Sequence, residues 1–219
     1  GQQQRTALAR AIVKNATLVL LDEPLANLDY KLREELREEL PKIFAESGAI
    51  FVYATTEPSE ALLLGGNTAT LSEGRITQFG ETINVYRRPS DLLTARTFAD
   101  PPLNTIALVK KGASFELNGQ PVLGMPAHLS SIADGPVTVA FHPHHLSLAA
   151  LPGAMAMRSR TLVSEIAGSE SFIHVEYGTA RWVCLAHGIH DIDPDREIDV
   201  FIDTRHLMAF GADGRALGA

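Results

Sequence analysis

The first part of the chain alternates apolar runs with amphipathic segments, as α/β proteins do. Two aliphatic runs, TLVLL at 17–21 and AIFVYA at 49–54, have the continuous hydrophobicity of parallel strands that are buried on both faces. The segment between them carries an apolar residue at every fourth position from Leu32 to Phe44, which predicts an amphipathic helix that is bent or weakened near Pro41. The order strand, helix, strand predicts a parallel pair with a right-handed crossover.

The pattern changes after about residue 100. Before that point, EPSEALLL begins another helix, and TATLSEGRITQFG predicts two short strands around a turn at Glu73 and Gly74. After it come short alternating segments with frequent Gly and Pro, including a hairpin signal at Asn118 and Gly119. We therefore expect an α/β domain over residues 1–95 and an all-β barrel or sandwich over residues 96–219.

Net charge, the length of the apolar runs and the cysteine count limit the functions and cellular settings that we expect for this chain. The net charge of −7 and a pI near 5.6 disfavour a general nucleic-acid binder, so we expect no nucleic-acid partner. No apolar run reaches the roughly 18 residues that a membrane span needs, so any membrane role is expected to be peripheral. The chain has one cysteine, Cys184, which allows no internal disulfide and fits a reducing, cytoplasmic setting.

Two adjacent acids, Asp22 and Glu23, directly follow the first aliphatic run. The carboxyl end of a buried parallel strand is where α/β folds bind ligands. In a nucleotide hydrolase, Asp22 would bind Mg²⁺, often through water, and Glu23 would polarise the water that attacks the γ-phosphate. The plain alternative is a solvated turn from strand to loop.

The neighbouring residues resemble a known family. GQQQRTALARAIVKNATLVLLDEPLANLD resembles the ATP-binding cassette (ABC) family, from the end of its signature motif through the aspartate-bearing strand to the D-loop. EALLLGGNTATLSEGRITQFGETINVYRRPSD resembles the cassette end of import ATPases for sugars, polyols and related solutes. VAFHPHHL and MAFGADGRAL resemble their C-terminal TOBE or OB-like barrel. The resemblance implies a partial P-loop NTPase cassette of α/β class, followed by an all-β barrel domain.

The resemblance also implies roles for individual residues. Gly1 and Gln2 would end the signature at a helix N-terminus and contact ATP held by the other protomer, and Asp29 would lie in the D-loop at the same interface. Thr56 stands where the family has a histidine that hydrogen-bonds the γ-phosphate. Threonine cannot carry positive charge or reach as far, so we expect slower or differently sensed hydrolysis. The plain alternatives are a flexible end at Gly1, a solvated first turn at Gln2 and a helix N-cap at Asp29.

As a whole, the resemblance implies an ATPase subunit of an importer for carbohydrate, polyol or glycerol phosphate, which uses ATP and Mg²⁺. It would lie peripherally on the cytoplasmic face of the membrane. Its partners would be a second ATPase subunit, identical or not, the permease, and indirectly an extracytoplasmic solute-binding protein. The G-x-x-x-x-G-K-[ST] loop that binds phosphate does not occur in these 219 residues. We expect it upstream in a longer ATPase, and we expect this chain alone to neither bind ATP tightly nor hydrolyse it.

Other hypotheses fit parts of the pattern. The chain could be a non-catalytic regulatory or dimerisation module whose barrel binds a small ligand or protein. A cassette ATPase that works on DNA or ribosomes is disfavoured by the acidic balance. His142, His144 and His145 suggest a zinc cluster, for which a histidine-rich tract is weak support, whereas His206 is expected to be structural. Trp182 is expected to be half-buried in a barrel strand.

Overall fold

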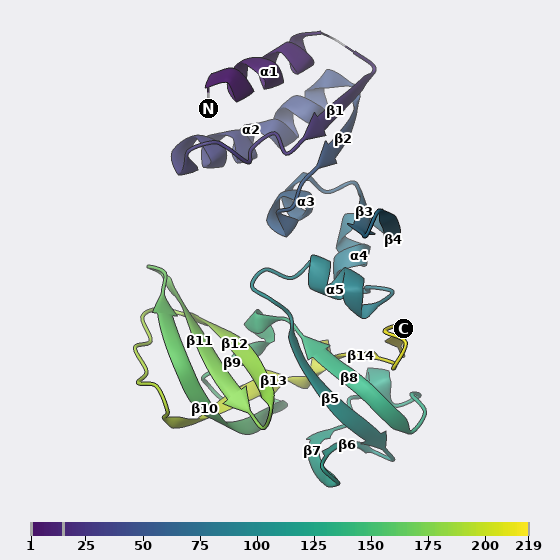
Figure 1. The fold of residues 1–219 in the computed structure, drawn as a ribbon, viewed down its shortest axis with the longest axis vertical. Helices are drawn as coiled ribbons and strands as arrows, with labels where there is room; N and C mark the ends of the chain where they lie inside the picture. The colour runs from purple at the N-terminus through teal and green to yellow at the C-terminus, as the bar shows by residue number, and fades with distance from the viewer. Residues whose placement is uncertain (1, 15, 219) are drawn as a thin grey trace. The chain divides into compact units, whose positions relative to one another are not determined.

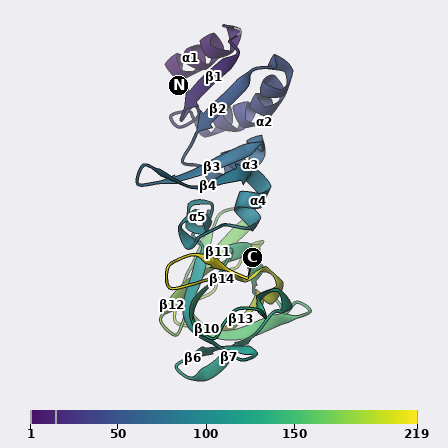
Figure 2. The same ribbon diagram turned by 90° about the vertical axis from the view of Figure 1, so that its right-hand side faces the viewer.

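A computed structural model describes residues 2–14 and 16–218. They form two compact units, which Figures 1 and 2 show from two directions. The first unit contains the residues up to Ala69 together with Phe79–Val85, and the second contains the remainder. A mixed α/β region is therefore followed by a β-rich region, which confirms the predicted fold class.

The first unit begins with helices and strands in alternation. They are α1 (Gln2–Val13), β1 (Leu18–Asp22), α2 (Tyr30–Ser47), β2 (Ile50–Ala54) and α3 (Pro58–Leu64). The two strands pair in parallel, with Leu18 beside Ile50 and Asp22 beside Ala54. The predicted strand, helix, strand unit is confirmed, and both strands end at the same edge of their sheet (Figure 1).

Helix α2 forms because its sequence supplies both a cap and an apolar stripe. The Asp29 side chain accepts a hydrogen bond from the Leu32 amide at 3.1 Å and so begins the helix. On the stripe, Leu32 is buried, and Phe44 stacks on Phe51 of β2 with ring centroids 3.9 Å apart. The helix continues through Pro41, so the expected weak point does not end it.

Strands β1 and β2 bury only one face among the described residues. Val19 and Leu21 join a buried cluster with Leu8 of α1 and with residues of α2. The alternate apolar residues are exposed, and they are Leu18, Leu20, Ile50 and Val52. The expectation of burial on both faces is therefore wrong for this structure, because α1 and α2 pack against a single side of the pair.

A hairpin and two short helices follow. They are β3 (Asn67–Ser72), β4 (Arg75–Glu81), α4 (Thr82–Arg87) and α5 (Leu92–Thr97). Glu73 and Gly74 have φ values of 49° and 74°, as a two-residue hairpin turn requires, so the predicted turn is confirmed. The Thr77 hydroxyl lies 2.7 Å from that of Thr70 and 2.8 Å from that of Thr94, which ties the hairpin to α5. No helix in the described part of the chain is long and apolar enough to cross a membrane.

The second unit contains two antiparallel sheets. The six-stranded sheet has the spatial order β15 (Ala216–Leu217), β14 (Met208–Phe210), β8 (Gly135–Phe141), β5 (Asn104–Lys111), β6 (Ser114–Leu117) and β7 (Gln120–Gly124). The predicted turn at Asn118 and Gly119 joins β6 to β7, and both residues have positive φ.

The other sheet curls into a nearly closed five-strand barrel. Its order is β12 (Ala180–His187), β11 (Glu170–Tyr177), β10 (Ala154–Ile166), β13 (Glu197–Asp203) and β9 (Leu146–Ser147). Its two end strands meet, since Cys184 Sγ of β12 donates to the Leu146 carbonyl of β9 at 3.0 Å. The described part of the unit also contains the short 3₁₀ turns η1 (Ala127–Leu129), η2 (Pro143–His145) and η3 (Thr204–His206). Both η2 and η3 lie where the chain passes between the two sheets.

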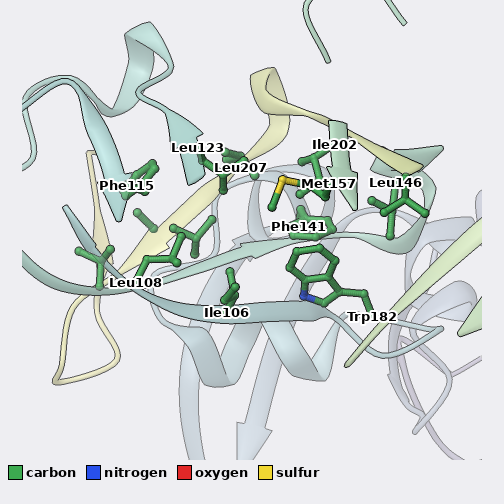
Figure 3. Packing of buried hydrophobic residues seen from close by; sticks show 14 of the residues in the cluster. Ile106, Leu108, Phe115, Leu123, Phe141, Leu146, Met157, Trp182, Ile202 and Leu207 are labelled. Carbon is green, nitrogen blue, oxygen red and sulfur yellow. The ribbon is translucent and has the colours of Figure 1, made fainter. Parts of the chain in front are cut away.

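The core of the second unit joins the two sheets (Figure 3). Trp182 is 1% exposed, not half-buried as expected, and its ring lies edge-on to Phe141 with centroids 5.3 Å apart. Full burial is possible because the indole Nε1 donates to the Thr105 carbonyl at 3.1 Å. Asn104 exchanges two hydrogen bonds with the Val183 backbone, at 2.7 and 2.8 Å. These links connect β5 of one sheet to β12 of the other.

Candidate functional site

The two parallel strands of the first unit end side by side, at an edge that carries two carboxylates. Asp22 is the last residue of β1 and is exposed, beside Ala54 at the end of β2. Glu23 follows at once and is half-buried. Since α/β folds place ligands outside the carboxyl ends of their strands, this edge is the candidate site.

The Glu23 backbone adopts a conformation that residues with a Cβ rarely take. Its φ of 45° lies in the left-handed region, which costs about 1–2 kcal/mol for such a residue. The Glu23 amide donates to the Ala54 carbonyl at 2.9 Å, and the Glu23 carbonyl accepts from the Ala26 amide at 3.2 Å. A strained residue persists where its surroundings hold it this way, and such residues cluster at functional sites.

A partly buried polar network lies next to the end of β2. The Glu60 side chain, on α3, is 4% exposed, and one of its oxygens accepts hydrogen bonds from Tyr53 Oη at 2.9 Å and Thr55 Oγ1 at 2.7 Å. The pKa of Tyr53 is raised, first by burial, then by its hydrogen bond to Glu60, and further by the negative charges of Glu60 and Glu23. The negative charge of Glu23 is thus a minor contribution, beside burial and Glu60, to the raised pKa of Tyr53.

Thr56 lies two residues beyond the end of β2, at the same edge as Asp22 and Glu23. Its side chain is exposed. The residues on either side of it are bonded to each other, since the Glu57 amide donates to Thr55 Oγ1 at 3.0 Å. Of the predicted site residues, the structure brings these three together.

The other predicted residues lie at helix N-termini. Asp29 is exposed and is the N-cap of α2, so the alternative structural role given for it is present. Gln2 is the first residue of α1 and is exposed, with its carbonyl accepting from the Thr6 hydroxyl at 2.9 Å. Gly1 lies outside the described residues.

Sequence reasoning did not single out the Tyr53, Thr55 and Glu60 network. The available signal was an acid placed directly before the apolar run ALLL at the start of a helix. An isolated acid at such a position indicates a buried carboxylate with partners, but the partners come from the preceding strand and are visible only in three dimensions.

A second polar cluster lies at η2 and η3 of the second unit. The ring centroids of His142 and His144 are 5.4 Å apart, those of His144 and His145 are 4.1 Å apart, and those of His145 and His206 are 4.0 Å apart. His206, expected to be a structural histidine, lies in η3 and stacks on His145. His142, His144, His145 and His206 together are called the histidine column below. Burial, with the neighbouring imidazoles, lowers the pKa of His142 to about 4 and that of His145 to about 3.

The geometry of the histidine column does not suit zinc. The rings of His142 and His144 are stacked with planes 12° apart, and those of His145 and His206 with planes 5° apart. Ring nitrogens of face-to-face imidazoles point in parallel planes, whereas tetrahedral zinc needs them to converge. Within residues 2–14 and 16–218, no group of three or more His, Cys, Asp or Glu side chains is arranged to hold a metal ion.

Comparison with known proteins shows similarity to import ATP-binding proteins. The chain is 34% identical over 180 residues to the xylose/arabinose import ATP-binding protein XacK of Haloferax volcanii. It is 36% identical over 176 residues to the sn-glycerol-3-phosphate import ATP-binding protein UgpC of Ruegeria pomeroyi, and 32% identical over 191 residues to that of Shigella sonnei. No protein-family model matches the chain.

The similarity covers most of this chain but only part of each relative. It extends over 81%, 80% and 85% of the chain, and over 47%, 48% and 53% of the three relatives, respectively. The chain thus spans about half the length of the curated relatives that it matches.

Proposed function

We propose, from the homology of this chain to import ATP-binding proteins, that it is part of the ATP-hydrolysing subunit of an ABC importer for a sugar, polyol or glycerol phosphate. The observation that carries the proposal is the edge at the ends of β1 and β2. There the exposed Asp22 is followed by Glu23, which is held in a strained turn by the neighbouring strand.

Asp22 is the proposed Mg²⁺ ligand. Mg²⁺ prefers oxygen ligands, keeps several waters, and is usually bound by one or two carboxylates together with substrate phosphates. An exposed carboxylate at a strand end suits such a site, either directly or through water. When bound, the ion would neutralise charge on the phosphates of ATP.

Glu23 is the proposed general base. Its backbone is held by Ala54 and Ala26, so its carboxylate leaves the strand end from a defined position. From there it would orient a water and accept its proton as that water attacks the γ-phosphate. Thr56 would contribute one hydrogen bond from the neighbouring strand end.

Gly1, Gln2 and Asp29 are proposed to face a second ATPase subunit. Free amides at a helix N-terminus suit a phosphate, which would belong to ATP held by that partner. The phosphate-binding loop would come from residues outside this chain, so these 219 residues alone are proposed to be inactive. In the cell, the subunit would bind a permease at the cytoplasmic face of the membrane and respond through it to an extracytoplasmic solute-binding protein.

Glu23→Gln in the whole gene product tests the proposal. The substitution keeps the size of the side chain and leaves Asp22 in place, so ATP binding should persist. Turnover should fall by about 10²-fold or more, because a positioned general base contributes that much. Asp22→Asn is the matched variant, and it should weaken the Mg²⁺ dependence of ATP binding instead. Unchanged turnover in Glu23→Gln would show that Glu23 is not the base.

A further inference from the structure

We propose that Glu60 is a positioning residue for ATP hydrolysis, which acts through Thr55 to set where Thr56 lies at the edge of the sheet. This inference rests on the proposed function and adds to it a residue that never touches the substrate. It begins from the burial of a carboxylate at the start of α3, four residues after Thr56.

Burying a carboxylate is costly unless it is hydrogen-bonded. Glu60 is 4% exposed, and both hydroxyl groups that reach it, from Tyr53 and Thr55, donate to the same oxygen. Charge-assisted hydrogen bonds of this kind are stronger than those between neutral groups. The carboxylate therefore fixes the side chains of two residues that flank the end of β2.

The hydrogen bonds continue from Thr55 into the backbone around Thr56. Thr55 Oγ1 donates to Glu60 and also accepts from the Glu57 amide at 3.0 Å. The Glu57 carbonyl accepts in turn from the Glu60 amide at 3.1 Å, which closes a ring of contacts. On the other side, the Ala54 carbonyl is bonded to the Glu23 amide at 2.9 Å. Hydrogen bonds therefore hold the residues on both sides of Thr56, namely Ala54, Thr55 and Glu57.

The backbone position of Thr56 matters because its side chain is short. A longer side chain can reach a phosphate from several backbone positions, whereas a threonine hydroxyl depends on where the backbone puts it. A displacement of about 1 Å at a reacting centre can cost on the order of 10²-fold in rate. Loss of the Glu60 contact should therefore lower kcat without a comparable loss of ATP affinity.

Thr55→Val in the whole gene product is the direct test, because it keeps the shape of the side chain and removes its hydroxyl. We expect kcat to fall by about ten-fold with KM for ATP within about two-fold. The conservative variant Thr55→Ser keeps the hydroxyl and should keep kcat close to that of the unsubstituted protein. Glu60→Leu should behave like Thr55→Val, and Glu60→Gln, whose carbonyl oxygen still accepts both hydrogen bonds, should retain most of the turnover.

Tyr53→Phe is the matched control. It removes the other hydrogen bond to Glu60, so it should lower the melting temperature about as much as Thr55→Val, but it leaves the bond to Thr55 intact and should leave kcat unchanged. Equal kcat in Thr55→Val and Tyr53→Phe, with Glu23→Gln inactive, would overturn the positioning role alone. An active Glu23→Gln would overturn the proposed function itself, and the positioning role with it.

Hydrogen exchange on the 219-residue chain gives a second readout that needs no turnover. The Glu57 amide should exchange faster in Thr55→Val and in Glu60→Leu than in Tyr53→Phe or Thr55→Ser. Equal protection of that amide in all four variants would contradict the proposed ring of contacts.

Discussion

At the scale of single residues, the backbone of Glu23 has an energetic consequence of its own. Glycine in place of alanine usually destabilises a regular element by about 0.5–1 kcal/mol, since it loses more conformational freedom on folding. Where φ is positive, as at Glu23, this order reverses, because only the residue with a Cβ is strained.

We therefore predict that Glu23→Gly is more stable than Glu23→Ala, by about 1 kcal/mol. Both substitutions remove the same carboxylate, so their difference isolates the backbone. Urea unfolding of the two variants of this chain measures it. An alanine variant as stable as the glycine variant would mean that the turn relaxes to negative φ.

Thr56 allows a prediction about turnover. If the threonine limits hydrolysis because it lacks the charge and reach of an imidazole, Thr56→His should raise kcat of the whole gene product, by several-fold. The double variant Glu23→Gln, Thr56→His should stay inactive. A histidine variant with unchanged kcat would show that Thr56 does not limit the reaction.

At the scale of elements, the turns η2 and η3 carry the histidine column and connect the two sheets of the second unit. The pKa of His142 and of His145 is lowered from the ordinary 6.5 to about 4 and about 3, mainly by burial and then by neighbouring imidazoles, with Asp203 opposing the effect at His145. At pH values between about 3 and 6.5, the unfolded chain therefore binds more protons at these two histidines than the folded chain does. Stability from these residues is present above pH 6.5 and is lost progressively as the pH falls from 6.5 to about 3.

His145→Phe should weaken this pH dependence, because it keeps a stacking ring and cannot be protonated. Between pH 7 and pH 5, the variant should lose less unfolding free energy than the unsubstituted chain, by on the order of 1 kcal/mol, since one pKa unit corresponds to about 1.4 kcal/mol. Urea titrations of the chain at several pH values measure this. The exposed His187, changed to Gln, is the control and should leave the slope as it is. An identical slope in His145→Phe would show that the column is not the source.

At the scale of the whole molecule, the candidate site is one edge of a two-stranded sheet, and the proposed nucleotide pocket also needs a phosphate loop that does not occur in these 219 residues. Without the phosphate loop, the chain lacks the backbone amides and lysine that cradle the β- and γ-phosphates. Calorimetry on the 219 residues should therefore show no micromolar ATP binding, whereas the whole gene product should bind. Micromolar affinity for the chain alone would contradict the proposed division of the pocket.

Much of the fold follows from local patterns. The strands 17–21 and 49–54, the amphipathic helix between them, and the turns at Glu73–Gly74 and Asn118–Gly119 are all present, because periodicity and turn chemistry act over a few residues. The position of Asp22 and Glu23 at a strand end follows in the same way. The exposed outer face of β1 and β2 does not, since burial depends on which elements pack there.

By itself, the sequence determined the α/β and all-β halves, the acidic strand end and the resemblance to import ATPases. Only the tertiary structure decided that Glu23 has a left-handed backbone, that Glu60 ties Tyr53 and Thr55 together, and that His206 completes the histidine column. The physical reason is the range of the interactions. Hydrophobic period and turn preference are written in neighbouring residues, whereas the partners of a buried charge or a stacked ring are brought together only when distant segments pack.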